Sequence, residues 1–146
     1  MSIRLFLAAL CALLTAPLAS SQDLSTHVLD LARGVGGSGV PVMLEVKQGD
    51  AWTEIGRAVS AENGRVESFD RTPSAPGAPS AGWYRLTFDM EGYWSSFASE
   101  APEDSAGPAL PFFPEIVVVF RLDDPSVHTH VPVVVSPYGY STYRGN

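Results

Sequence analysis

Cysteine is nearly absent from this chain of 146 residues, in which Cys11 is the only one. A disulfide needs two cysteines, so no disulfide framework can support the fold. Cys11 also lies inside an apolar run, residues 5–14, which we interpret as part of a cleaved leader. The exported protein is therefore expected to lack thiol chemistry and to be stabilised by its core alone.

Basic residues are also scarce. Lys and Arg number 9 against 16 Asp and Glu, which gives a formal net charge of −7 at pH 7. Nucleic acids and anionic membranes are bound mainly through clustered Lys and Arg that displace counterions. The composition therefore argues against both kinds of partner, and any positive charge at a functional site must come from single arginines.

No hydrophobic run is long enough to span a membrane. Near the N-terminus, one cation, Arg4, precedes the apolar run, and small residues follow up to Ser20. This order is typical of a secretory signal peptide. We predict that residues 1–20 are a cleaved signal peptide, that residues 21–146 form one exported domain, and that no membrane attachment remains after cleavage.

A helical hydrophobic period is missing as well, whereas strand patterns recur. β-Branched and aromatic residues alternate with polar ones or form short apolar runs in residues 40–47, 82–89, 115–121 and 131–136. Such runs between Pro- and Gly-rich turns are typical of strands. Only residues 91–99 have the composition of a short helix. We predict an all-β fold, an antiparallel β-sandwich with at most one short helix.

A glycine-rich segment from Gly34 to Gly39 matches the Gly-x-Gly-x-x-Gly pattern of dinucleotide-binding sites. In those sites the segment precedes a helix whose N-terminus holds the pyrophosphate. Here a strand pattern follows, so we interpret the segment as a hairpin loop.

The chain has only three histidines, His27, His128 and His130. Residues two apart on a strand point to the same face, so His128 and His130 could converge on one site, and His27 could join them. Three neutral imidazoles would suit a catalytic zinc. They could instead serve as a metal-free acid and base, or be structural, because imidazole titrates near neutral pH. The spacing leaves these three alternatives open.

Arg65 follows Asn63-Gly64, a turn signal that places it at the start of a strand. Its planar guanidinium suits an anion or a carbonyl, and a solvated hairpin residue is the alternative.

The C-terminal segment from Tyr138 is aromatic and almost uncharged. A terminus of this kind is typical of a docked segment, either a closing edge strand or part of a site.

Five segments carry a resemblance to a known family. They are LSTHVLD at 24–30, NGR at 63–65, FFPEI at 112–116, HTHVP at 128–132 and SPYGYSTYRG at 136–145. Together they resemble the transthyretin-related 5-hydroxyisourate hydrolases over essentially the whole exported part. The Tyr-Arg-Gly near the end distinguishes the enzyme branch from the hormone-carrying transthyretins.

The resemblance implies a small β-sandwich that forms a homotetramer, a dimer of dimers, with active sites in the central channel. It implies hydrolysis of a ring amide of the small molecule 5-hydroxyisourate to 2-oxo-4-hydroxy-4-carboxy-5-ureidoimidazoline, in urate degradation, without metal or cofactor. Exported members of the family occur in the bacterial periplasm, so we expect a periplasmic location, with secretion as the alternative.

The resemblance also implies the site residues. The catalytic set is His27, Arg65 and His130, and the substrate-binding set is His128, Tyr143, Arg144, Gly145 and Asn146. Amide hydrolysis needs a base for water, a donor for the oxyanion and an acid for the leaving nitrogen. We expect one of His27 and His130 to be the base, the other to be the acid, and Arg65 to hold the oxyanion. The sequence does not decide between the two histidines.

Two features depart from the family pattern. The family usually ends in Ser, whereas this chain ends in Asn146, which is bulkier and lacks a hydroxyl. Residues 101–111 look longer than the family's link, and we interpret them as a surface loop that could also cover part of the channel mouth.

Two alternative functions are a non-catalytic small-ligand binding protein and a zinc hydrolase built on the three histidines.

Overall fold

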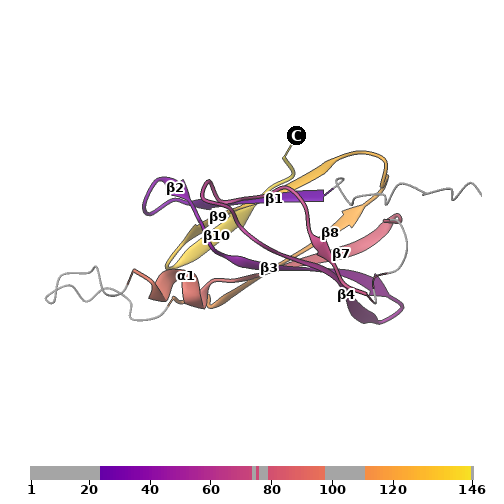
Figure 1. Ribbon diagram of the computed structural model, residues 1–146, viewed down its shortest axis with the longest axis horizontal. Helices are drawn as coiled ribbons and strands as arrows, with labels where there is room; N and C mark the ends of the chain where they lie inside the picture. The colour runs from indigo at the N-terminus through magenta and orange to yellow at the C-terminus, as the bar shows by residue number, and fades with distance from the viewer. Residues whose placement is uncertain (1–23, 74, 76–78, 98–110, 146) are drawn as a thin grey trace, which may run out of the picture.

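The protein is described from a computed structural model, in which residues 24–73, 75, 79–97 and 111–145 are described. Figure 1 shows two β-layers packed face to face, with β1, β9 and β10 in one layer and β3, β4, β7 and β8 in the other. The predicted signal peptide, Asn146 and nearly all of the 101–111 segment lie outside the described residues. Within the described part, no helix has the length and apolar character needed to cross a membrane.

The first sheet has the order β10-β9-β1-β2, and β5 also pairs with β1. Its strands are β1 (Leu24–Asp30), β2 (Val35–Gly36), β5 (Arg65–Val66), β9 (Thr129–Ser136) and β10 (Gly139–Thr142). The second sheet has the order β6-β4-β3-β7-β8. Its strands are β3 (Pro41–Gln48), β4 (Ala51–Val59), β6 (Asp70–Arg71), β7 (Gly82–Asp89) and β8 (Glu115–Leu122).

One strand pair departs from the predicted antiparallel pattern. β1 pairs with β9 in parallel, with Ser25 opposite His130 and Val28 opposite Val133, whereas every other strand pair is antiparallel among the described residues. Parallel neighbours need a long connection, and nearly the whole domain lies between these two strands. The two motifs at opposite ends of the sequence thus become neighbours.

The core lies between the two sheets because each strand places alternate side chains inward. Val133 and Val135 of β9 are fully buried, as are Leu86 and Phe88 of β7. On β1, Val28 is equally buried. Because alternate residues face opposite sides, Ser25, His27 and His130 belong to the outer face of the first sheet.

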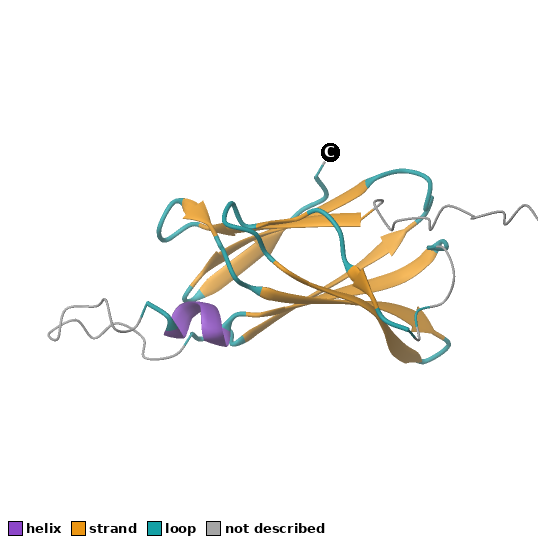
Figure 2. Ribbon diagram, viewed as in Figure 1, coloured by secondary structure: helices purple, strands orange, loops and turns teal. Residues whose placement is uncertain are grey.

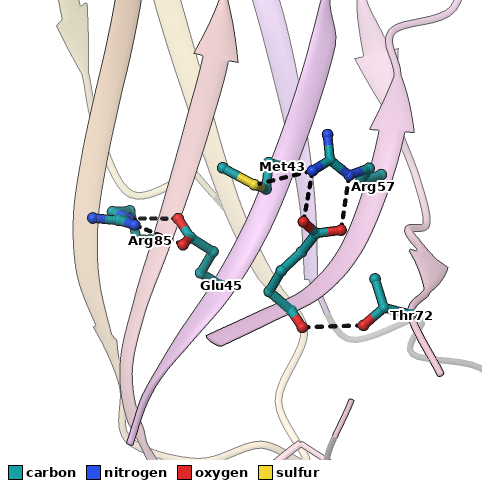
Figure 3. Close-up of polar contacts among 6 residues, drawn as sticks. Met43, Glu45, Arg57, Thr72 and Arg85 are labelled. Atoms are coloured by element: carbon teal, nitrogen blue, oxygen red, sulfur yellow. Dashed lines mark hydrogen bonds and ion pairs between the residues drawn. The ribbon is translucent and has the colours of Figure 1, made fainter. Parts of the chain in front are cut away.

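The outer face of the second sheet holds charged pairs (Figure 3). Glu45, only 6% exposed, accepts two hydrogen bonds from Arg85, at 2.5 and 2.6 Å. The Arg85 guanidinium also lies 4.7 Å from the centre of the Trp52 ring. Beside this pair, Arg57 donates two hydrogen bonds to Glu54, at 2.7 and 2.6 Å. These side chains lie on the sheet opposite the histidines.

Two local predictions can be compared directly with the structure. The short helix is α1 (Glu91–Ser95), beside the end of β7 (Figure 2). The glycine-rich segment is a hairpin, since β2 turns back on β1 and no helix follows it. Gly34 and Gly39 have positive φ angles, 69° and 77°, which glycine adopts without strain. Both predictions are confirmed.

Candidate active site

β1 supplies the first part of the site because its motif alternates between the core and the outer face. Thr26 points inward, is fully buried and donates to the carbonyl of Val131 at 2.6 Å. Its neighbours Ser25 and His27 therefore share the outer face. Ser25 is 7% exposed and His27 is half-buried.

The Asn63-Gly64 turn brings Arg65 beside His27, as predicted for a strand start. β5 pairs with β1 so that Arg65 lies opposite His27. Nε2 of His27 bonds the backbone oxygen of Asn63 at 2.7 Å. A carbonyl oxygen only accepts, so Nε2 carries a proton and Nδ1 is the nitrogen left for chemistry. The backbone N–H of Arg65 donates to Oδ1 of Asn63 at 3.0 Å, which secures the turn.

Gly64 allows this turn to lie close to β1. Its φ is +80°, and a Cβ at this position would lie 2.8 Å from the Gly37 nitrogen and overlap the Val28 carbonyl oxygen. The backbone N–H of Val28 donates to the Gly64 oxygen at 2.8 Å. Only glycine combines that φ with that close approach.

His128 and His130 do converge, and a serine joins them. The Ser25 hydroxyl lies 2.7 Å from Nδ1 of His130 and 2.9 Å from Nε2 of His128. The two rings are nearly parallel, with centres 6.5 Å apart. The sequence analysis did not single out Ser25. Its signal was its position two residues before His27, which places both on the same face of β1.

The C-terminal segment is docked at His130. The backbone N–H of Gly145 donates to the His130 oxygen at 2.8 Å, and a Cβ on Gly145 would lie 2.6 Å from the Cδ2 of His130. Gly145 therefore touches the catalytic candidate directly. Tyr143 and Arg144 line a different hollow, of about 350 Å³, formed with β8 and β9. This hollow is distinct from the one at the histidines.

A second hollow, of about 520 Å³, opens at the cluster. Its lining residues are Ser25, Arg65, Val66, Glu67, Ser68 and His128. His130 is hydrogen-bonded to Ser25, which lines this hollow. A small planar molecule in it would therefore meet a guanidinium, a hydroxyl and an imidazole.

The surroundings of His130 favour its neutral form. Burial lowers the pKa of His130 first, and charge repulsion from Arg65, and from His27 and His128 when they are protonated, lowers it further, while a hydrogen bond with the backbone of Ser25 acts in the opposite direction. A neutral imidazole at neutral pH can accept a proton, which is the requirement for a general base.

The arrangement does not by itself indicate a metal centre. The described residues contain no group of three or more His, Cys, Asp or Glu side chains placed to hold a metal ion. One nitrogen each of His128 and His130 is already hydrogen-bonded to Ser25.

A two-layer sandwich with titratable side chains gathered on one outer face defines a transthyretin-like protein whose site is equipped for acid and base chemistry. The chain belongs to the HIUase/Transthyretin family, whose model matches residues 24–145. The family membership predicted from the five motifs is confirmed.

Known proteins of this family are similar over most of the chain. The 5-hydroxyisourate hydrolase of Deinococcus radiodurans is 38% identical over 125 residues, which are 84% of this chain and 95% of that relative. The solved 5-hydroxyisourate hydrolase of Klebsiella pneumoniae has a TM-score of 0.60 at 30% identity, covering 84% of this chain and 98% of its own. Transthyretin from Sparus aurata has a TM-score of 0.66 at 25% identity, covering 85% and 97%. The predicted sandwich is thereby confirmed.

Proposed function

We propose that this protein hydrolyses 5-hydroxyisourate by opening a ring amide, with 2-oxo-4-hydroxy-4-carboxy-5-ureidoimidazoline as the product. The chain is an enzyme of a family whose relatives at 31–38% identity are named 5-hydroxyisourate hydrolases. One structural observation carries the proposal. A half-buried histidine with a lowered pKa, His130, lies in the same cluster as Arg65 and His27, beside an open hollow.

The chemistry assigns a role to each of these groups. His130, held neutral, takes a proton from water as the oxygen attacks the carbonyl carbon. Arg65 donates hydrogen bonds to the oxygen on which negative charge develops, and its planar fork suits that task. When the carbon–nitrogen bond breaks, His27 in its doubly protonated form delivers its Nδ1 proton to the leaving nitrogen and keeps its Nε2 proton on the bond to Asn63. The proton that His130 took from water is released to solvent, and His27 regains one from solvent, so both groups return to their starting states. Water thereby adds OH to carbon and H to nitrogen.

The C-terminal segment and the assembly complete the proposal. In this proposal the substrate lies in a channel between the dimers of a homotetramer. It is contacted there by His128, Tyr143, Arg144, Gly145 and Asn146. Gly145 supports this because it is bonded to His130. Tyr143 and Arg144 line the other hollow of their own chain, so their contribution would depend on how copies assemble. The leader-like residues 1–20 support a periplasmic location.

The direct test follows the ultraviolet decay of 5-hydroxyisourate generated in place by urate oxidase, with and without the purified exported form. We expect acceleration that survives a chelator. His27→Asn and His130→Asn should each lower kcat by about 10²- to 10⁴-fold, the usual contribution of a general acid or base. Wild-type decay at the spontaneous rate would favour the ligand-binding alternative. Acceleration abolished by chelator would favour the zinc site, and full activity in both variants would contradict the assignment.

A further inference from the structure

Ser25 joins two histidines through a single hydroxyl. Its oxygen lies within hydrogen-bond distance of Nδ1 of His130 and Nε2 of His128, at 2.7 and 2.9 Å. A serine hydroxyl has one proton to donate and lone pairs to accept with. It therefore donates to one imidazole and accepts from the other when both bonds are made, and the tautomers of the two rings are coupled.

Two proton arrangements satisfy this constraint. In the first, Nδ1–H of His130 donates to the hydroxyl and the hydroxyl donates to Nε2 of His128, so Nε2 of His130 has no proton and can act as a base. In the second, both bonds are reversed, and Nε2 of His130 carries a proton. The first arrangement becomes the second when one proton moves along each of the two hydrogen bonds and Nε2 of His130 gains a proton from outside.

We propose that Ser25 is a positioning residue that connects His130 to His128 as a proton relay. The proposal rests on the hydrolase function proposed above. When Nε2 of His130 takes a proton from water, its Nδ1 proton passes to Ser25 while the Ser25 proton passes to Nε2 of His128. One positive charge is thereby moved from His130 to His128, and no other bond changes. In the reverse direction, His130 releases its Nε2 proton as His128 returns one through Ser25.

The surroundings explain why the charge should leave His130. His130 is half-buried, whereas His128, just before β9, is exposed. The charged groups that face His130 are Arg65 on β5 and His27 on β1, together with His128 itself. Arg65 and His27 stay near the reacting atoms and disfavour an imidazolium at His130, whereas His128 can exchange a proton with water. Glu67, which lines the same hollow as His128, adds a negative charge on that side.

Packing indicates that Ser25 is held for this role. It is 7% exposed, and it lies opposite His130 in the parallel register of β1 and β9. The inward neighbour Thr26 is bonded to Val131, which limits sliding of the two strands. The hydroxyl is therefore held at a position set by the backbone of both strands.

The test combines Ser25→Ala, Ser25→Thr and His128→Asn with Ser141→Ala as a matched control on β10. We expect Ser25→Ala to lower kcat by roughly 10- to 100-fold, with KM little changed. The upper end of this range equals the smallest usual contribution of a general base. Without the hydroxyl, a proton taken up by His130 can no longer be passed on to His128, so the acidic limb of the kcat profile should move to lower pH. Ser25→Thr should restore most of the activity, and Ser141→Ala should match wild type.

Nitrogen-15 spectra of the histidine rings in the substrate-free protein give a readout independent of turnover. Ser25→Ala should change the tautomer populations of both His128 and His130, and His128→Asn should change those of His130. His128→Asn alters an exposed side chain, so it tests the relay even if Ser25→Ala fails to fold.

The possible outcomes separate the two proposals. Wild-type protein that does not accelerate 5-hydroxyisourate decay would overturn the hydrolase function and the catalytic relay with it. Active wild-type protein with unchanged kcat, pH profile and nitrogen-15 spectra in both Ser25→Ala and His128→Asn would overturn the relay alone.

Discussion

His130 is the residue at which the different features of the site meet. Its ring is bonded to Ser25, its backbone oxygen accepts from Gly145, and its ionisation is opposed by burial and by Arg65. A histidine in ordinary solvent would be partly charged near its usual pKa. The surroundings, rather than the residue type, make this one suited to accept a proton.

The lowered pKa of His130 predicts the pH dependence of turnover. The base must be neutral, so kcat rises with pH through that pKa and is flat above it. Because the pKa of His130 lies below the usual histidine value of 6.5, the rise should be centred below pH 6.5. Arg65→Gln should move the rise to higher pH, because a positive charge is removed, even though kcat itself falls. A wild-type limb centred above pH 6.5 would contradict this prediction.

At the scale of elements, the site depends on the contact between the Asn63-Gly64 turn and β1. That turn holds Arg65 opposite His27, and its Asn63 carbonyl orients the His27 ring. The turn belongs to neither of the two long strands of the site, so its position is determined by a few backbone contacts. A small displacement there would move two of the three proposed catalytic groups.

Gly64→Ala should therefore reduce both stability and activity. The substitution forces a non-glycine residue to φ +80° and places a Cβ against backbone atoms of β1 and of the glycine-rich hairpin. We expect a loss of about 2–4 kcal/mol in the free energy of unfolding, measured by urea denaturation. Gly49→Ala is the matched control, with φ +61° but no atom within 4 Å of the new Cβ. It should lose only about 1–2 kcal/mol, and equal losses would contradict the role of close approach.

At the scale of the whole molecule, the two edge strands β8 and β10 lie on the same side of the sandwich. Both contribute to the hollow that Tyr143 and Arg144 line. β8 also exposes Val117 and Val119, at 41% and 51%. Edge strands with exposed apolar side chains are typical sites of association between chains.

The proposed homotetramer is tested by light scattering coupled to size exclusion. The exported form should elute with four times the mass of one chain. Val119→Lys, which places a charge on the β8 edge, should shift the mass toward smaller species and lower activity if assembly completes the site. Val59→Lys is the control, since Val59 is 63% exposed and lies at the end of β4. A monomer with full activity would contradict the proposed assembly.

Much of the fold could be predicted because its strand signals are local. The alternation in residues 82–89 corresponds to β7, and the apolar run at 131–136 lies in β9. β4 was not predicted, since its side chains are mostly half-buried and the alternation is weak. The parallel pairing of β1 with β9 was also missed, because it joins residues about a hundred positions apart and leaves no local pattern.

The sequence by itself determined the all-β class, the turn before Arg65, the shared face of His128 and His130, and the family. These follow from periodicity, turn chemistry and motifs, which depend on neighbouring residues. Only the tertiary structure decided that Ser25 lies between the two histidines, that the pKa of His130 is lowered, and that Gly145 docks on His130. Those features depend on the register between β1 and β9 and on burial, and both arise only when distant segments pack together.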